Sequence, residues 1–151
     1  MQVDQIHDEA FWNKVPSAHL RPLIDAVVPY GHLGFGYTMK VLGDPHDPEA
    51  TAVVIWKAPA GYVLQRHSHG CGRFEVIIEG SVTDEHGTVF EVGGIMTAEP
   101  DEMYGPIHAG PNGYTSVEVF SRLEGCYLIT WDDPDGPRLD NRLEFRADHG
   151  G

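Results

Sequence analysis

Residues 61–80, GYVLQRHSHGCGRFEVIIEG, predict a strand, a glycine-rich loop and a second strand that ends in a turn. His67 and His69 are two residues apart, and alternate side chains of an extended chain point to the same face. Neighbouring imidazoles suit a divalent transition metal. Glu75 has the parity of the two histidines, and the apolar run 76–78 returns the chain to a core. The stretch therefore predicts a metal site on one face of a β-sheet.

Many short strands are expected along the rest of the chain. The segment 51–57, TAVVIWK, is β-branched and almost entirely apolar, which favours a central strand. Turn-forming residues gather at 43–48 and 84–87, and the segment 99–113 is rich in proline and glycine. Further strands are expected at 35–42, 81–83, 88–91, 95–98, 115–121 and 126–131. Closely spaced short strands indicate an all-β sandwich or barrel.

The two ends of the chain are expected to flank this barrel. Residues 5–14 place Ile6, Ala10 and Phe11 on one face, which predicts one short helix. The three prolines at 16, 22 and 29 favour extended or turn segments after it. The acidic tail is expected to cross the outside, with 142–146 as an edge strand. The single domain thus comprises an arm (1–34), a barrel (35–131) and a tail (132–151).

Length and charge exclude several classes of protein. A chain of 151 residues forms one domain with one core. Its formal net charge of -13 argues against nucleic acid or an anionic membrane as a partner. No apolar run approaches the roughly 20 residues of a membrane helix. The polar, acidic start is not typical of a secretory signal, and Cys71 and Cys126 do not make a disulfide framework, so we expect a cytoplasmic protein.

Residues 61–80 resemble the first signature of the cupin superfamily, Gly-x5-His-x-His-x3,4-Glu-x6-Gly. Gly61, His67, His69 and Gly80 match this signature. Glu75 stands two residues later than the glutamate of the family, a step that keeps the same strand face. The resemblance implies a double-stranded β-helix, or jelly roll, in which His67 and His69 bind a metal. Glu75 is then either a further ligand or a base beside the metal.

A third ligand is expected from the second cupin signature, Gly-x5-Pro-x-Gly-x2-His-x3-Asn. Residues 94–100 match its front half, but Glu102 and Gly105 stand where the second glycine and the histidine belong. The nearest histidine is His108, three residues later, and an insertion in the proline-rich turn would bring it into place. We predict His108 as the third ligand. Tyr104 is the alternative inward group, either as a ligand or as an acid–base group.

Each of these assignments has a structural alternative. His67 and His69 would also be explained as a solvated strand pair, and His108 as a surface loop residue. Glu75 would otherwise be an exposed carboxylate or the partner of Arg73. Arg73 would clamp a carboxylate or carbonyl of the substrate if it lay inside the barrel, whereas outside the barrel it would have no such role.

Region 38–121 as a whole is similar to small cupins of the ChrR type and to cupin dioxygenases that cleave rings or ketones. The similarity lies in Arg-His-x-His at 66–69, in Glu79-Gly80, in 83–87 and in the Gly-Pro-rich stretch 105–113. It implies a mononuclear Fe(II) dioxygenase that acts on a small carbonyl compound, such as a diketone or hydroxyketone. Mn(II), Ni(II) and Zn(II) also suit such ligands. By the same resemblance we expect a homodimer.

Two other functions remain open. The first is a redox-neutral lyase, isomerase or decarboxylase, in which the metal polarises a carbonyl while Glu75 or Tyr104 moves a proton. The second is a non-catalytic metal-binding sensor domain, which predicts a closed coordination shell and no ligand pocket. Cupins host many reactions, so the fold does not identify the substrate.

Overall fold

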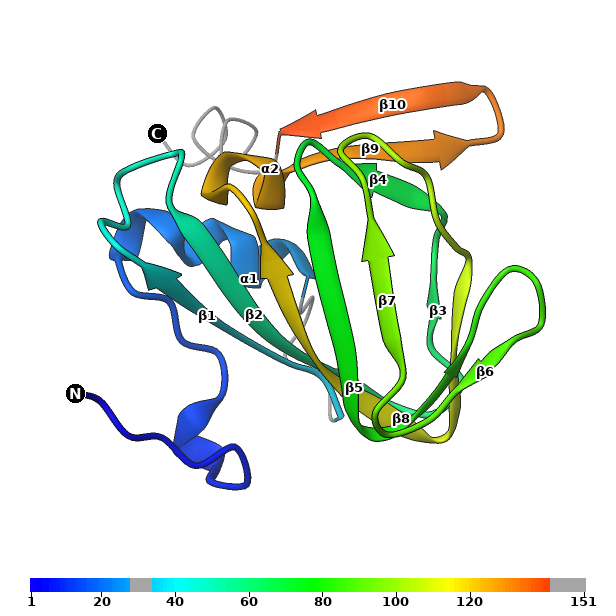
Figure 1. Ribbon diagram of the computed structural model, residues 1–151, viewed down its shortest axis with the longest axis horizontal. Helices are drawn as coiled ribbons and strands as arrows, with labels where there is room; N and C mark the ends of the chain where they lie inside the picture. Colours follow the sequence, from blue (N-terminus) through cyan, green and yellow to red (C-terminus); the bar gives the residue numbers. More distant parts are fainter. Residues whose placement is uncertain (28–33, 142–151) are drawn as a thin grey trace.

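The computed structural model describes residues 1–27 and 34–141, which form two antiparallel sheets (Figure 1). The larger sheet contains β1 (Gly36–Leu42), β2 (Thr51–Ala58), β3 (Val63–Leu64), β5 (Arg73–Thr83), β6 (Val89–Phe90), β7 (Ile95–Ala98) and β8 (Ile107–Phe120). The smaller sheet contains β4 (His67–His69), β9 (Leu128–Asp133) and β10 (Gly136–Asn141). The prediction of an all-β fold is confirmed.

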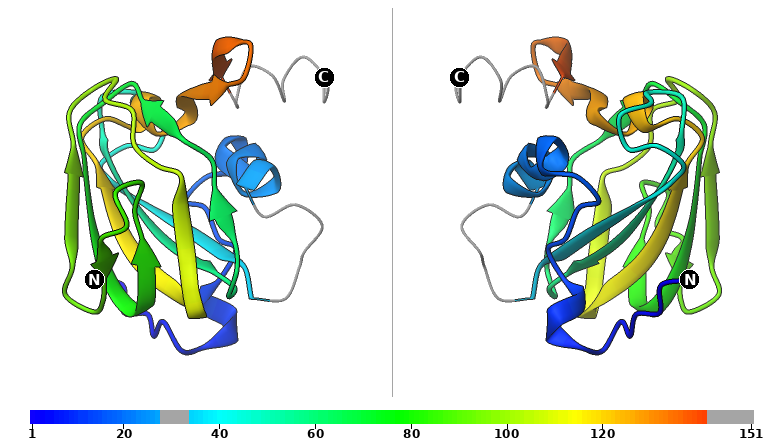
Figure 2. Two further views of the ribbon diagram at one scale, coloured as in Figure 1. Left: turned by 90° about the vertical axis from the view of Figure 1, so that its right-hand side faces the viewer. Right: turned by 90° about the vertical axis from the view of Figure 1, so that its left-hand side faces the viewer.

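The larger sheet has the order β1-β2-β8-β5-β6, and β3 and β7 pair with β8 and β5, respectively. β2 is flanked on both sides, as its apolar sequence predicted. The inward-facing row across β2, β8 and β5 runs Val54, Glu118, Glu75. Two glutamates therefore lie directly opposite each other on the neighbouring strands β8 and β5. Figure 2 shows the larger sheet, which contains these strands, from two sides.

The N-terminal helix forms later in the chain than the sequence predicted. Only a 3-10 turn, Glu9–Phe11, occupies the segment 5–14, whereas α1 spans Arg21–Val27. Pro22 lies in the first turn of α1, where a missing N–H leaves no hydrogen bond unmade, so proline favours the start of this helix. Leu23 and Ile24 extend the core from α1. No helix in the described part of the chain is long and apolar enough to span a membrane.

The last strands also differ from the prediction. α2 (Leu123–Tyr127) occupies the start of the predicted strand 126–131, and β9 begins only at Leu128. β8 begins at Ile107, so the second half of the predicted loop 99–113 is strand. β10 extends the smaller sheet beyond residue 131, where the sequence analysis ended the barrel. The edge strand expected at 142–146 lies outside the described residues.

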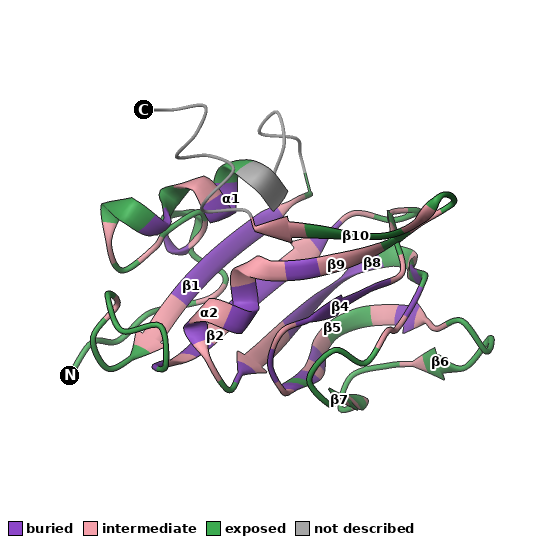
Figure 3. Cartoon of the chain, turned by 90° about the horizontal axis from the view of Figure 1, so that it is seen from above, coloured by how far each residue is buried: buried purple, intermediate pink, exposed green. Residues whose placement is uncertain are grey.

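Buried residues concentrate on β1, β2 and β4, which enclose the interior together with β8 (Figure 3). Gly80, the closing glycine of the first signature, is required by a close approach of β8. A Cβ atom at Gly80 would lie 2.0 Å from the carbonyl oxygen of Gly113, and the backbone has φ +72°. The predicted hairpin at 84–87 is confirmed, because β5 and β6 pair on either side of it.

Candidate metal centre

His67 and His69 lie side by side on β4 and line a cavity of about 170 Å³ between the two sheets. β4 pairs with β9, which places His67 opposite Trp131 and His69 opposite Ile129. Both histidines are buried, with 4% and 8% of their surface exposed. The alternative of a solvated strand pair is therefore wrong, because both imidazoles belong to the interior.

The backbone fixes both imidazoles in one tautomer. Nδ1 of His67 lies 2.7 Å from the carbonyl oxygen of Gln65, and Nδ1 of His69 lies 3.3 Å from that of Gly125. A carbonyl oxygen only accepts, so each Nδ1 carries a hydrogen, and in the neutral imidazole Nε2 then carries the lone pair. Burial, together with His67 and Arg73, lowers the pKa of His69 well below its ordinary value. Neutral imidazoles held in this way are typical of metal ligands.

Tyr104 is joined to His67 through both backbone and side chain. The two residues form a β-bridge, in which each backbone N–H donates to the carbonyl of the other at 3.0 and 2.9 Å. The Tyr104 hydroxyl donates to Nε2 of His67 at 2.9 Å, and the ring centroids lie 4.6 Å apart. Burial raises the pKa of Tyr104 well above its ordinary value. The phenol oxygen thus lies beside the nitrogen that carries the lone pair.

A buried cluster of one arginine and two glutamates packs against Tyr104 through the arginine. The Arg73 guanidinium lies 4.2 Å from the centre of the Tyr104 ring. Its Nη2 atom donates to Glu75 at 2.5 Å and lies 3.7 Å from a carboxyl oxygen of Glu118. Ser116 donates to the other oxygen of Glu75 at 2.6 Å. Within the described residues, Nε of Arg73 is buried without a hydrogen-bond partner, so this polar cluster is not fully satisfied.

The pKa values of the two glutamates in this cluster are shifted in opposite directions. Burial would raise the pKa of Glu75, but Arg73 and the hydrogen bonds from Glu118, Ser116 and Arg73 outweigh it and hold that pKa below its ordinary value. Burial and the charge of Glu75 raise the pKa of Glu118 well above its ordinary value. Two hydrogen-bonded carboxyl groups need a proton between them. The shared proton is therefore held more strongly by Glu118 than by Glu75, and Glu118 lines the cavity.

We expect the Glu118→Gln variant to gain stability relative to the wild type as the pH rises above about 4.3, the ordinary pKa of a glutamate. Above this pH the unfolded chain releases the Glu118 proton while the folded chain keeps it, which favours unfolding by up to about 1.4 kcal/mol per pH unit. A glutamine keeps the hydrogen bond to Glu75 and has no proton to lose. Urea unfolding between about pH 5 and pH 8 measures the difference.

The matched control for this prediction is Glu91→Gln, because Glu91 is an exposed carboxylate on the outside of the molecule. Its free energy of unfolding relative to the wild type should not change over the same pH range. A constant difference for Glu118→Gln as well would mean that Glu118 is ionised in the folded protein.

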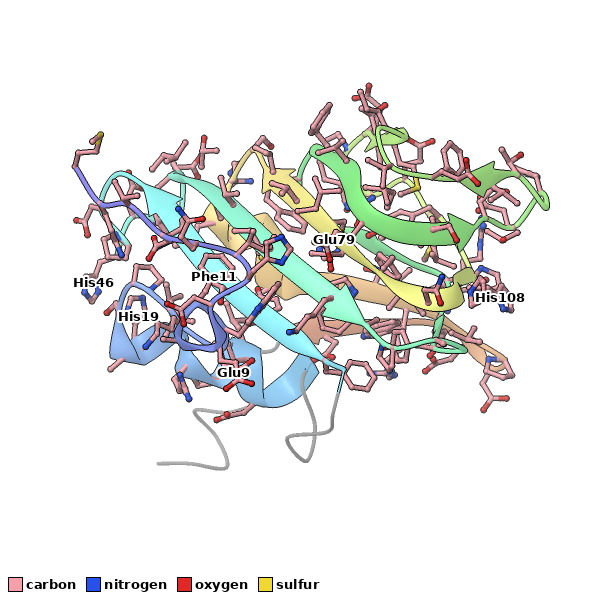
Figure 4. The ribbon with its side chains drawn as sticks, turned by 90° about the horizontal axis from the view of Figure 1, so that it is seen from below. Glu9, Phe11, His19, His46, Glu79 and His108 are labelled. Carbon is pink, nitrogen blue, oxygen red and sulfur yellow. The ribbon has the colours of Figure 1, made fainter. Side chains whose placement is uncertain are left out.

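The structure does not bring His108 to the two buried histidines. His108 is exposed on β8, opposite Val63 of β3, and lies at the edge of the molecule (Figure 4). Its neighbour Ile107 is the buried residue, so strand alternation turns His108 outward. The insertion assumed in the sequence analysis instead extends β8 by several residues. The prediction that His108 is the third ligand is therefore not supported by the structure.

Glu75 and Arg73 also have roles that differ from the predicted ones. Glu75 points inward as its parity predicted, but its two oxygens are taken by Arg73 and Ser116, and it does not line the cavity. Metal binding or base catalysis by Glu75 would require breaking this ion pair. Arg73 likewise does not line the cavity, so it is not placed to clamp a substrate. The alternative in which Glu75 is the partner of Arg73 describes the structure.

Glu118 is the functional candidate that the sequence analysis did not identify. It lies in the segment TSVEVF, where a single acidic residue interrupts an apolar strand that was predicted correctly. An acidic residue in an apolar strand indicates a functional site only if it is known to face the interior. The register of β8 against β5 provides this information, because it sets Glu118 opposite the inward-facing Glu75.

The cavity is suited to a small, mostly apolar molecule. Six aromatic side chains contribute to its wall, namely Tyr37, Trp56, Tyr62, Tyr104, Phe120 and Trp131. Its polar groups are the two imidazoles, the tyrosine hydroxyls and the carboxyl group of Glu118. An apolar protein cavity of about 150 Å³ holds benzene, so 170 Å³ admits a compound of similar size.

Comparison with solved structures identifies the fold. An RmlC-like cupin from Ralstonia eutropha superposes with a TM-score of 0.56 at 16% identity, covering 82% of this chain and 81% of that chain. An acetylacetone dioxygenase from Acinetobacter johnsonii gives 0.56 at 13% identity, with 96% and 89% covered. A proposed acetylacetone dioxygenase from Methylibium petroleiphilum gives 0.54 at 14% identity, with 100% and 98% covered. No protein-family model and no curated protein sequence matches the chain.

The chain therefore has the cupin jelly-roll fold, as its first signature predicted. At sequence identities of 13 to 16%, these solved structures show the fold of the chain and not its reaction.

Proposed function

We propose that this protein is a metal-dependent cupin enzyme that oxygenates a small uncharged carbonyl compound at a mononuclear iron(II) centre. The observation that carries the proposal is the pair of buried imidazoles at the cavity, with both Nδ1 atoms engaged by carbonyl oxygens. Iron(II), like Mn(II), Ni(II) and Zn(II), accepts such nitrogen donors. When bound, iron supplies the redox chemistry with dioxygen that amino-acid side chains lack.

The other residues of the cavity would bind and orient the substrate. The aromatic wall excludes water and favours an apolar molecule with few polar atoms. Burial and the charge of Glu75 raise the pKa of Glu118 at the cavity, while Glu75 neutralises Arg73. None of the described residues that line the cavity is a lysine or an arginine, which supports a neutral carbonyl compound over a carboxylate. A homodimer in the cytoplasm is part of the proposal by resemblance to the superfamily.

A redox-neutral lyase or isomerase is the second candidate, and the carboxyl group of Glu118, which lines the cavity and has a raised pKa, favours it. In such a reaction the carboxylic acid would donate a proton to the substrate, and the resulting carboxylate would take one back. A metal-binding domain without catalysis is less well supported, because a cavity of about 170 Å³ adjoins the two histidines.

We expect the iron-loaded protein to consume oxygen when it is given pentane-2,4-dione or 3-hydroxybutan-2-one. Removing the metal with a chelator should lower the rate at least about 100-fold, since metal catalysis contributes several kcal/mol to the barrier. An oxygen electrode with product analysis makes the measurement. Conversion that proceeds equally well without oxygen would establish the redox-neutral reaction instead. If no carbonyl compound is converted under either condition, the protein is not the enzyme we propose.

A further inference from the structure

Tyr104 lies where a third metal-binding atom is needed. Two imidazoles alone leave a transition-metal ion with few protein donors. Among residues 1–27 and 34–141, no group of three or more His, Cys, Asp or Glu side chains is placed to hold a metal. We propose that the phenolate oxygen of Tyr104 is the third protein ligand, which gives a centre of two histidines and one tyrosinate. This inference rests on the proposed function, because it takes a metal bound by His67 and His69 as given.

The backbone determines the position of Tyr104. Its β-bridge to His67 consists of two hydrogen bonds of 2.9 and 3.0 Å, so the two residues are directly opposite each other on neighbouring chain segments. Side chains of such a pair lie on the same face of the sheet. His67 faces the cavity, and Tyr104 must therefore face it as well.

The distance between the two donor atoms fits a common metal. The Tyr104 oxygen lies 2.9 Å from Nε2 of His67. Two donors that bind one ion at about 2.1 Å and at right angles lie about 3.0 Å apart. In the absence of metal the same contact is a hydrogen bond, in which the hydroxyl hydrogen occupies the lone pair of Nε2. To bind a metal, the phenol would release this proton to solvent, and the two side chains would turn until the Nε2 lone pair and the phenolate oxygen both point to the ion.

Arg73 acts as a positioning residue for the tyrosine. Its guanidinium lies 4.2 Å from the centre of the Tyr104 ring, and a cation over an aromatic ring attracts its electrons. Glu75 and Glu118 both lie within ion-pair distance of the same guanidinium. The buried cluster of Arg73, Glu75 and Glu118 would thus hold the Tyr104 oxygen beside Nε2 of His67.

The experiment is visible absorption spectroscopy of the iron(III) form, prepared by oxidising the iron(II)-loaded protein. A tyrosinate bound to iron(III) produces an intense phenolate-to-iron charge-transfer band, whereas imidazole and carboxylate ligands do not. We expect a band proportional to bound iron in the wild type. Tyr104→Phe and Tyr104→His should lose it, and Tyr104→His should still bind iron because it supplies a replacement nitrogen donor. Tyr37→Phe and Tyr62→Phe are the matched controls, since both residues line the same cavity.

Iron content, measured on the same samples, separates this inference from the proposed function. Wild-type protein that binds iron without the band overturns the tyrosinate ligand and leaves the proposed function standing. A band that persists in both Tyr104 variants, or that disappears in Tyr37→Phe or Tyr62→Phe, assigns a different tyrosine and overturns the inference. Wild-type protein that binds no iron, and no other divalent metal, overturns both.

Discussion

Anaerobically purified wild-type protein is expected to carry about one iron per chain, and His67→Ala and His69→Ala to carry almost none. Each substitution removes one of two nitrogen donors that the structure places at the cavity. Loss of a residue that only hydrogen-bonds to a metal ligand lowers metal affinity about 10–100-fold, and loss of a direct ligand lowers it more. Elemental analysis after gel filtration gives the metal content, and oxygen uptake on the same samples should fall in parallel.

His108→Ala is the matched control for these two variants. It removes the histidine that the sequence analysis favoured as third ligand, and this side chain is exposed on β8. We expect its metal content and activity to equal those of the wild type. If His108→Ala lost iron as completely as His69→Ala, the metal would have to lie outside the cavity, and the site described above would be wrong.

The fold could be predicted from the sequence because its signals are local. The segment 51–57 is apolar and β-branched, and the glycine spacing around His67 and His69 is specific to one superfamily of jelly rolls. The errors lie where local signals conflict with tertiary packing. The proline at position 22 starts a helix in place of breaking one, and residues 107–113 belong to β8 despite their glycines and proline, with 107–109 paired to β3 and β5. Propensity does not report which partners are available to a segment.

The site could be predicted only in part, because its third member depends on the register of distant segments. The signature places a histidine at position 105, and the structure sets Tyr104, its immediate neighbour, opposite His67. The sequence offers Tyr104 as the alternative third ligand, but nothing in it decides between Tyr104 and His108. The ion pair of Arg73 and Glu75 was recognisable from the i, i+2 spacing, whereas Glu118 enters only through the pairing of β5 with β8.

We expect Arg73→Met to lower the free energy of unfolding by about 3–5 kcal/mol, the usual cost of removing one partner of a buried ion pair. Methionine fills much of the same volume, but it leaves the Glu75 carboxylate without its cation. The side chains of Arg73 and Glu75 are 3% and 7% exposed, so water cannot replace the lost partner. Burial would then raise the pKa of Glu75, and the variant should regain stability as the pH falls and the carboxyl group is protonated. Urea unfolding at neutral and acidic pH measures both effects.

Two controls test whether burial is the cause. Arg122 also binds a glutamate with two nitrogen atoms, at 2.6 and 2.9 Å from Glu49, but this pair is exposed to solvent. Arg122→Met should therefore change stability little, because solvent screens such pairs. The double variant Arg73→Met/Glu75→Met should recover most of the loss, since apolar replacement of a whole buried pair is often neutral. If Arg73→Met costs no more than Arg122→Met, the cluster contributes nothing to the fold, and its retention beside Tyr104 would have to be explained by the metal centre alone.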